Sequence, residues 1–293
     1  MKRILLTGAG SRSFIGRNLK EQLSDRYAIF APSHAELELL DYAALERYCA
    51  EHQIEVIVHA AIHVPMFNGA ANEFFNDMQM FQNIEKISHR VEKVLYFGSG
   101  AEYDKRRDIR AIREEEFGDC IPVSEYGLAK YTMNQIARAS SNLYNLRLFG
   151  VFGKYELWQI KFLSNLCCKA LFGLPLTVRR DCYFDFLYID DLARIVAWFV
   201  EHKPRWHDYN ICFGEDFLLT ELAQKVRAVS KKDLPIELLS PERNLDYSAS
   251  NQRLLAEYDG APLLQMDNAL EMLYSYYTNI QETIDLNVLR DSR

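Results

Sequence analysis

The residues best suited to chemistry are Tyr126 and Lys130, in the stretch Tyr126-Gly127-Leu128-Ala129-Lys130. Four-residue spacing places the two side chains on one face of a helix. An ammonium group beside a phenol favours the phenolate, which predicts that the tyrosine pKa falls from about 10 toward the working pH. Such a phenol can exchange a proton with a substrate oxygen. A surface tyrosine one turn from a solvated lysine gives the same pattern, so the surrounding elements decide its meaning.

A glycine-rich turn near the N-terminus could bind a cofactor. The apolar residues 3–7 (RILLT) are typical of a buried strand in a parallel sheet, and a helix-like pattern begins after residue 16. This order presents backbone N–H groups and a helix N-terminus to a diphosphate. An ordinary tight turn has similar glycines, but the position directly after the first strand favours a dinucleotide site. The candidate residues are Gly8, Gly10, Arg12, Ser13, Phe14, Ile15 and Gly16.

Polar groups after the second expected strand, residues 27–30, bear on the choice of cofactor. An NAD site usually has a carboxylate at this strand end, which accepts a hydrogen bond from the ribose 2′-OH. No carboxylate follows directly here, and Glu36 comes a few residues late. Ser33, His34 and Arg12 are the polar groups expected nearby, and an arginine suits a 2′-phosphate. We therefore expect NADP(H), with NAD(H) as the alternative.

Further strands alternate with helices. Residues 55–61 (EVIVHAA) predict a strand that runs into a small-residue turn at Ala60-Ala61, where a cofactor backbone could approach closely. Residues 93–97 (KVLYF) and 145–149 predict two more strands, with helices over 73–89 and 124–140. The fold class is α/β, a doubly wound parallel Rossmann sheet, which binds ligands at the carboxyl ends of its strands. Ser99 lies at such an end, although a turn serine would fit as well.

The alternation becomes less regular after residue 153. Helices are expected over 158–172, 219–230 and 266–277, with a more polar helix over 279–293. Asp190 is a candidate N-cap for a helix that ends at Glu201. His59 and His63 have no third ligand nearby, so we expect structural histidines and no metal site.

Composition and net charge limit the classes of partner that we expect. The chain has 293 residues and a net charge of −7, which argues against nucleic acid or an anionic membrane as a main partner. Its six cysteines are scattered without a C-x-x-C pair, as in a reduced, cytoplasmic protein. The sequence has neither a signal-peptide core nor 18 consecutive uncharged apolar residues, so we expect no membrane insertion.

Together these segments resemble the extended short-chain dehydrogenase/reductases that act on nucleotide sugars. The resemblance covers nearly the whole chain, and it is strongest toward the GDP-L-fucose synthase group and nucleotide-sugar 4-ketoreductases. The matching segments are TGAGSRSFIG, HAA at 59–61, GSGAEY at 98–103, YGLAK, RLFGVFG, FDFLYIDDLA at 184–193 and YNICFGE at 209–215. Several ordered segments at family-like spacing are far more specific than any one of them.

The resemblance implies roles for individual residues. Ser99, Tyr126 and Lys130 match the catalytic trio, Gly8, Ser13 and Gly16 the glycine motif, and Asp41 a position that contacts adenine. It also implies a Rossmann domain over 1–154 with a return segment near 184–212. A smaller α/β C-terminal substrate-binding domain would comprise 155–183 and 213–293. Homodimers form in the family through paired helices, here residues 124–140.

Departures from the family pattern limit the chemistry. The glycine loop is about two residues longer than usual, and Ser13 replaces its middle glycine. Gly100 and Ala101 stand where the 4,6-dehydratases have an Asp-Glu pair, and Ala101 also replaces the cysteine of the epimerising synthases. No histidine occurs between His89 and His202, so the second epimerisation base is missing as well. Phe184 replaces an arginine that contacts the diphosphate; Tyr103, Arg179 and Arg180 are the remaining candidate substrate contacts.

Of the reactions known in this family, these departures leave hydride transfer at a ketone or carbinol. The resemblance therefore implies an NAD(P)-dependent reductase of a nucleotide-linked 4-keto-6-deoxy sugar, in surface polysaccharide synthesis. A 4-epimerase that keeps NAD bound would use the same three residues. A catalytically silent regulatory protein that binds the cofactor is the non-enzymatic alternative.

Overall fold

The computed structural model describes residues 1–63 and 72–291. Its centre is a six-stranded parallel sheet in the order β10-β6-β4-β3-β1-β2. The strands are β1 (Arg3–Thr7), β2 (Ala28–Phe30), β3 (Val56–His59), β4 (Lys93–Ser99), β6 (Leu143–Leu148) and β10 (Asp208–Ile211). The chain crosses over β1 on its way from β2 to β3, so the strand order reverses at β1 and β3. Ligands of doubly wound sheets bind at such a switch point.

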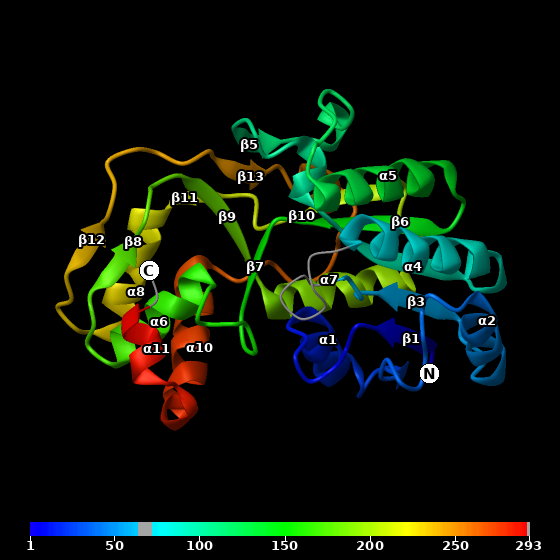
Figure 1. Cartoon of the computed structure of the whole chain (residues 1–293), viewed down its shortest axis with the longest axis horizontal. Helices are drawn as coiled ribbons and strands as arrows, with labels where there is room; N and C mark the ends of the chain where they lie inside the picture. Colours follow the sequence, from blue (N-terminus) through cyan, green and yellow to red (C-terminus); the bar gives the residue numbers. More distant parts are fainter. Residues whose placement is uncertain (64–71, 292–293) are drawn as a thin grey trace.

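Helices cover both faces of this sheet (Figure 1). α2 (Tyr42–Glu51), α4 (Glu73–Ile87) and α5 (Glu125–Ala139) share one hydrophobic cluster with Leu5 and Tyr96. Ile4 and Leu6 face the other way, into the cluster that includes α1 (Ile15–Leu23) and α7 (Ile189–Glu201). Successive strand residues point to opposite faces, so a continuously apolar strand such as β1 supplies both cores. The predicted doubly wound α/β fold is confirmed.

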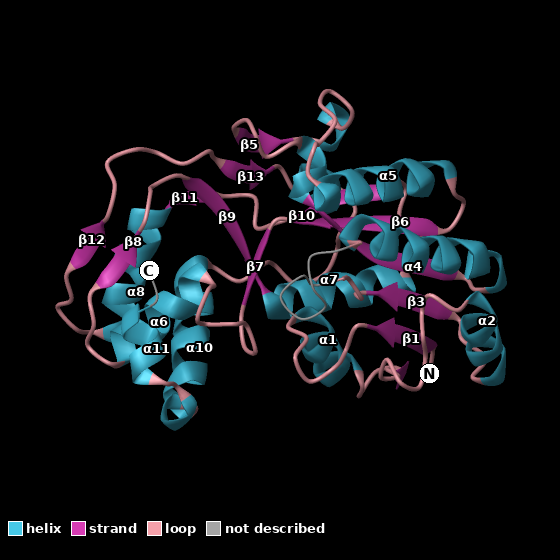
Figure 2. Ribbon diagram, viewed as in Figure 1, coloured by secondary structure: helices cyan, strands magenta, loops and turns pink. Residues whose placement is uncertain are grey.

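A second, mixed sheet lies beside the first (Figure 2). Its order is β11 (Asp216–Leu218), β9 (Tyr183–Tyr188), β13 (Tyr247–Ala249) and β5 (Ile109–Ile112), while β7 (Gly150–Phe152) also pairs with β9. β5 comes from the part of the chain that follows Ser99, and it pairs in parallel with β13, more than 130 residues later. This pairing brings a C-terminal strand close to the carboxyl end of β4.

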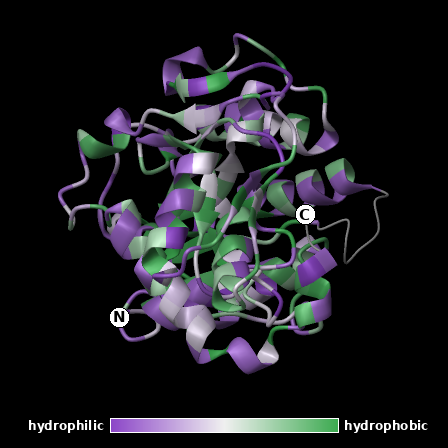
Figure 3. Cartoon of the chain, turned by 90° about the vertical axis from the view of Figure 1, so that its left-hand side faces the viewer, coloured by the Kyte–Doolittle hydropathy of each residue, from purple (hydrophilic) through white to green (hydrophobic). Residues whose placement is uncertain are grey.

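The remaining elements form a helical group around a small sheet. α6 (Phe162–Leu171), α8 (Leu219–Ser230) and α10 (Met266–Asn279) pack on one another, and β8 (Leu176–Val178) pairs with β12 (Ile236–Leu238). The short elements are η1 (Ser88–Arg90), η2 (Gly100–Tyr103), η3 (Glu114–Glu116), α9 (Gln252–Leu255), η4 (Gln281–Thr283) and α11 (Leu286–Asp291). Seen end-on, hydrophobic residues gather inside and hydrophilic ones on the outer helix faces (Figure 3).

Three sequence-based expectations about helix ends were wrong. α6 begins at Phe162 rather than 158, because residues 157–161 form turns in which Leu157 accepts from the N–H of Ile160 and Lys161. Tyr188, not Asp190, is the N-cap of α7; Asp190 lies in its first turn and accepts from Gln22 Nε2 at 2.8 Å. The expected helix over 279–293 is also wrong. In the described part of this segment, α10 ends at Asn279 and the next α-helix is the short α11. Within residues 1–63 and 72–291, no helix is long and apolar enough to cross a membrane.

Candidate active site

Ser99 occupies the carboxyl end of β4, where the strand turns into η2. Its Oγ accepts from the Ala101 N–H at 3.2 Å, and its own N–H donates to Glu102 Oε1 at 3.0 Å. These reciprocal bonds form a capping box that fixes the serine in one conformation. The hydroxyl therefore stands at a defined point above the sheet edge.

α5 places Tyr126 beside this hydroxyl. Ser124 caps the helix by accepting from the Gly127 N–H at 3.1 Å. A Cβ on Gly127 would lie 2.9 Å from the Ala101 carbonyl oxygen, so only glycine lets the helix approach η2 this closely. Tyr126 is half-buried, and its phenol lies close enough to the Ser99 side chain for the serine hydroxyl to lower the Tyr126 pKa. The structure thus brings two of the three predicted catalytic residues into contact.

Lys130 lies one turn further along α5 and is 3% exposed. Its Nζ donates to the Phe97 carbonyl at 2.9 Å and lies 5.8 Å from the centre of the Tyr126 ring. Burial lowers the pKa of this ammonium, while Asp77 of α4 and Glu102 raise it. The predicted trio is therefore assembled on two neighbouring elements, β4 and α5.

The expected fall in the Tyr126 pKa does not occur in this structure. Desolvation raises the Tyr126 pKa to about 12, and the hydrogen bond from Ser99 only partly opposes it. Asp77, Glu102 and Glu73 raise the pKa further through their negative charges. Spacing within a helix could not show this, because desolvation depends on what packs over the ring. At neutral pH Tyr126 is protonated, as a proton donor must be.

A buried polar network supports Ser99 from behind. Arg147 of β6 is fully buried and donates through Nε to Glu102 Oε2 at 2.7 Å, and through Nη2 to Asp208 Oδ2 at 3.0 Å. Asn145, two residues earlier on the same strand face, donates to both Glu102 oxygens. Sequence reasoning missed this network. The available signal was the pair of polar residues, Asn145 and Arg147, at alternate positions in an otherwise apolar strand.

Tyr103 belongs to this network and not to the predicted substrate surface. It is 1% exposed, and its hydroxyl donates to Asn210 Oδ1 at 3.1 Å while accepting from Arg147 Nη1 at 3.0 Å. The buried hydroxyl argues against the predicted substrate contact and favours a structural role.

The glycine loop forms a close-packed cradle at the switch point of the sheet. Gly8 has φ +71°, and a Cβ there would lie 2.6 Å from the Ala60 carbonyl carbon. A Cβ on Gly16 would lie 2.2 Å from the Gly8 carbonyl oxygen, so α1 starts directly against the first turn. Ser13 Oγ accepts from the Gly16 N–H at 3.1 Å. Phe14, the N-cap of α1, makes no side-chain cap hydrogen bond, and Ser13 Oγ accepts only from the Gly16 N–H, so the start of this helix still fits a dinucleotide diphosphate.

The predicted adenosine contacts have other partners in this structure. Asp41 caps α2 by accepting from the Ala44 N–H at 3.1 Å. Ser33 donates through both its N–H and its Oγ to Glu36 Oε2, each at 2.7 Å. Glu36, which comes late in the sequence, is thus brought back to the end of β2. A carboxylate at this position suits a ribose 2′-OH and weakens the sequence argument for NADP.

His59 and Arg180 have their direct bonding partners outside the trio. Burial lowers the pKa of His59 to about 3, so it stays neutral and bonds Thr7 Oγ1 at 2.9 Å. In the described ranges, 1–63 and 72–291, no group of three or more His, Cys, Asp or Glu could hold a metal. Arg179 and Arg180 line a hollow with Leu239 and Ser240, and Arg180 pairs with Glu242 at 2.7 Å. The ion pair of Arg180 is with Glu242 and not with a residue of the trio, so a substrate role for these arginines stays a prediction.

Tyr247 of β13 is the site residue that sequence reasoning did not find. The Ser99 side chain and Tyr126 both lie close enough to the Tyr247 phenol to shift its pKa. No sequence pattern identifies it, because it lies more than 120 residues from Tyr126 and reaches the site through the pairing of β13 with β5 and β9.

Comparison with known proteins identifies the family of this chain. The GDP-L-colitose synthase of Yersinia pseudotuberculosis is 24% identical over 94% of this chain and 98% of its own. The NADP-bound GDP-L-fucose synthetase of Naegleria fowleri has a TM-score of 0.80 at 15% identity, over 96% of this chain and 94% of that one. The NADP-bound GDP-mannoheptose C4 reductase of Campylobacter jejuni has a TM-score of 0.76 at 16% identity, over 94% and 98%. Residues 4–212 match the NAD dependent epimerase/dehydratase family, and the chain belongs to that family.

Proposed function

We propose that the protein is an NAD(P)-dependent reductase of a nucleotide-linked 4-keto sugar, a 4-keto-6-deoxy sugar being the favoured substrate. The observation that carries this proposal is the contact between Ser99 and a protonated Tyr126, with no carboxylate or thiol at the next two positions. Gly100 and Ala101 are both buried, so neither could be replaced by an acid without rearrangement. Ketone reduction needs a proton donor and an oxyanion donor and no second base.

Each residue of the site would have a separate role in the reduction of the ketone. The bound dinucleotide would supply a hydride to the ketone carbon, and the glycine cradle of Gly8, Ser13 and Gly16 would hold its diphosphate. Tyr126 gives its phenolic proton to the oxygen that gains the electron pair of the C=O π bond. Ser99 donates a hydrogen bond to the same oxygen as charge develops there. Lys130, held by the Phe97 carbonyl, stabilises the resulting phenolate.

Two relatives support the substrate class. Their names specify a GDP-linked colitose synthase and a GDP-mannoheptose C4 reductase, and both align over more than nine-tenths of this chain. We infer a nucleotide sugar as the partner of the same site here. Arg12 of the loop favours NADP(H), and Glu36 at the end of β2 favours NAD(H), so both cofactors belong in the assay.

A panel of 4-keto nucleotide sugars, each assayed with NADH and NADPH, tests the proposal. Cofactor oxidation, read at the nicotinamide absorbance band, should match product formation one to one with at least one ketone. Tyr126→Phe should abolish it while the protein keeps its fold. Interconversion of 4-epimers without net cofactor oxidation would replace the reductase with the epimerase. Lack of turnover in either assay would favour the silent regulatory protein.

A further inference from the structure

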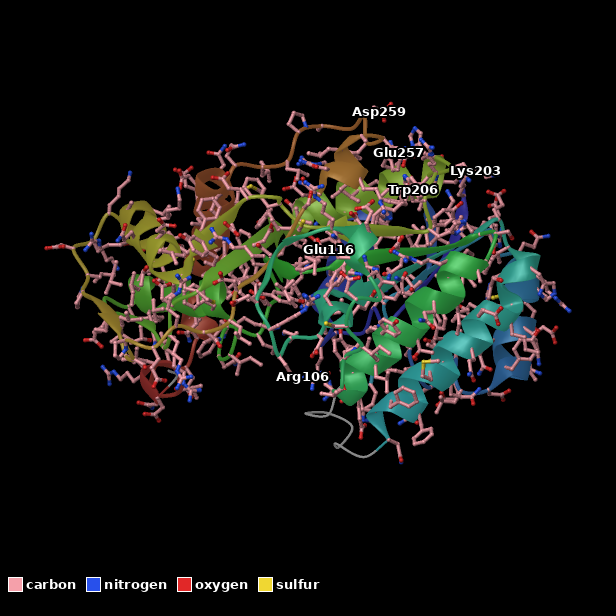
Figure 4. All side chains as sticks on the ribbon, turned by 90° about the horizontal axis from the view of Figure 1, so that it is seen from above. Arg106, Glu116, Lys203, Trp206, Glu257 and Asp259 are labelled. Carbon is pink, nitrogen blue, oxygen red and sulfur yellow. The ribbon has the colours of Figure 1, made fainter. Side chains whose placement is uncertain are left out.

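The Tyr247 ring is held firmly beside the active site. It is 8% exposed, and its centre lies 5.1 Å from the rings of Phe149 and of Phe184. Lys105 Nζ lies 4.5 Å from the same ring centre. Figure 4 shows the neighbouring Arg106 at the outer edge of the molecule, near the start of α5. Because packing fixes the ring, the Tyr247 hydroxyl has a defined position.

That hydroxyl lies directly against the residue that follows Ser99. A Cβ on Gly100 would be 2.4 Å from Tyr247 Oη and 2.7 Å from Phe149 Cε1. The absence of a side chain at position 100 therefore makes room for the Tyr247 hydroxyl, which lies close enough to the Ser99 side chain to interact with it. Position 100 is where the sequence departs from the acid pair of the dehydratases, and a phenol from another strand fills this space.

The Ser99 hydroxyl lies near two phenols but has a single proton. A serine hydroxyl has one proton to donate and two lone pairs to accept with. One lone pair accepts from the Ala101 N–H, and the hydroxyl also contacts both Tyr126 and Tyr247. With one proton, Ser99 can donate to only one phenol, so a hydrogen bond with the other phenol requires that phenol to be the donor. If Tyr247 donates, the Ser99 proton is directed at Tyr126.

We propose that Tyr247 is a positioning residue of the active site, whose hydroxyl donates to Ser99 and so aims the single Ser99 proton at the reacting oxygens. The inference rests on the proposed reductase function. During turnover the Ser99 proton would serve first the developing alkoxide and then the Tyr126 phenolate. A chain of donors also polarises each member, so Ser99 becomes a stronger donor when it accepts from Tyr247.

A double-mutant cycle tests the coupling through Ser99. Tyr247→Phe keeps the ring and removes only the oxygen, so we expect kcat to fall about 10- to 100-fold, less than the roughly 10²- to 10³-fold typical of a lost direct donor. In the Ser99→Ala background the same change should alter kcat less than about twofold, because the group it acts through is gone. Equal losses in both backgrounds, or no loss in the wild-type background, would overturn the proposal. Tyr277→Phe, which removes another buried hydroxyl in α10, is the control and should leave kcat unchanged.

A second measurement separates this proposal from the reductase function. Tyrosine carrying carbon-13 at Cζ reports the hydrogen bonding of each phenol by NMR without any substrate, and Tyr126→Phe assigns the Tyr126 resonance. Tyr247→Phe should move that resonance, and it should have no further effect once Ser99 is alanine. If no ketone is reduced but the resonance moves in this way, the reductase proposal fails and the coupling stands. An unmoved resonance in an active enzyme would refute the coupling alone.

Discussion

Lys130 Nζ donates to the carbonyl of Phe97 at 2.9 Å, two residues before Ser99 on β4. One hydrogen bond thus ties the helix that carries Tyr126 to the strand that presents Ser99. The lysine is 3% exposed, and the nearest charges that raise its pKa are Asp77 and Glu102. Because Asp77 also raises the pKa of Tyr126, this carboxylate acts on two members of the trio at once.

Asp77→Asn should lower the pKa of both Tyr126 and Lys130. Asparagine keeps an oxygen to accept from the His63 N–H, which Asp77 Oδ1 now does at 2.6 Å, so only the charge changes. Reduction requires protonated Tyr126, and the rate therefore falls as pH rises through the Tyr126 pKa. From a starting value of about 12, the alkaline limb of kcat should move to lower pH. A pH–rate profile in the proposed reductase assay measures this shift.

Glu73→Gln provides a graded comparison for Asp77→Asn. Glu73 has a smaller effect on the Tyr126 pKa than Asp77 has. The alkaline limb of kcat in Glu73→Gln should therefore move in the same direction by a smaller amount. A movement to higher pH in either variant would show that the sign of the electrostatic argument is wrong.

The sequence predicted the main sheet well, because buried parallel strands and glycine turns are local signals. β1 and α8 have the expected bounds, and the cradle glycines lie at the switch point. The Tyr126–Lys130 spacing also placed both residues on one helix face. Motif order identified the family because it combines many such local signals along one chain.

Properties that depend on distant segments could not be predicted. The Tyr126 pKa depends on desolvation by elements that pack around it, and Glu36 returns to Ser33 through a turn that sequence position alone does not show. Tyr247 reaches the neighbourhood of Ser99 because β13 pairs with β5 and with β9. Each of these features comes from tertiary contacts, for which one sequence gives no pairing information.

Gly16→Ala should disturb the cofactor cradle. The new Cβ would lie 2.2 Å from the Gly8 carbonyl oxygen, a backbone atom that cannot rotate away. Overpacking of this kind costs about 1–3 kcal/mol, so the cofactor-free protein should lose stability in urea unfolding, and NAD(P)H should bind about tenfold or more weakly by fluorescence titration. Gly10→Ala is the matched control, because a Cβ there meets nothing within 4 Å. It should change the free energy of unfolding of the cofactor-free protein by less than about 1 kcal/mol, and an equal loss in both variants would contradict the packing argument.

Arg147→Leu should destabilise the fold strongly. The guanidinium is fully buried between Glu102 and Asp208, at 2.7 and 3.0 Å. Although burial alone would raise the pKa of Asp208, Arg147 and Arg138 outweigh it and lower that pKa. Asp208 keeps its ion pairs with Arg138 and Arg253, but the buried Glu102 loses its cationic partner, at a cost of about 3–5 kcal/mol in urea unfolding. Lys225→Leu, which breaks the exposed pair with Asp267, should cost less than about 1 kcal/mol. Similar losses in the two variants would show that the network contributes no more than a surface ion pair.

Glu156→Gln should change how stability depends on pH. Glu156 is buried and accepts from Ser164 Oγ at 2.5 Å. Burial raises its pKa from 4.5 to about 7, so the folded state binds this proton more tightly than the unfolded state. The stabilisation is fully present below pH 4.5 and is lost as pH rises to about 7, a change of roughly 3 kcal/mol in the free energy of unfolding.

Glutamine is neutral throughout that range and retains an oxygen for Ser164. The free energy of unfolding of Glu156→Gln minus that of the wild type, measured with urea at several pH values, should therefore rise by about 3 kcal/mol between pH 4.5 and 7.5. The pKa of Asp185 is also raised by burial to about 7, but it contributes equally to both proteins and cancels in the difference. The exposed Glu271→Gln is the control, and its difference should stay level with pH. A level difference for Glu156→Gln would mean that Glu156 is ionised in the folded protein at the same pH as in the unfolded chain.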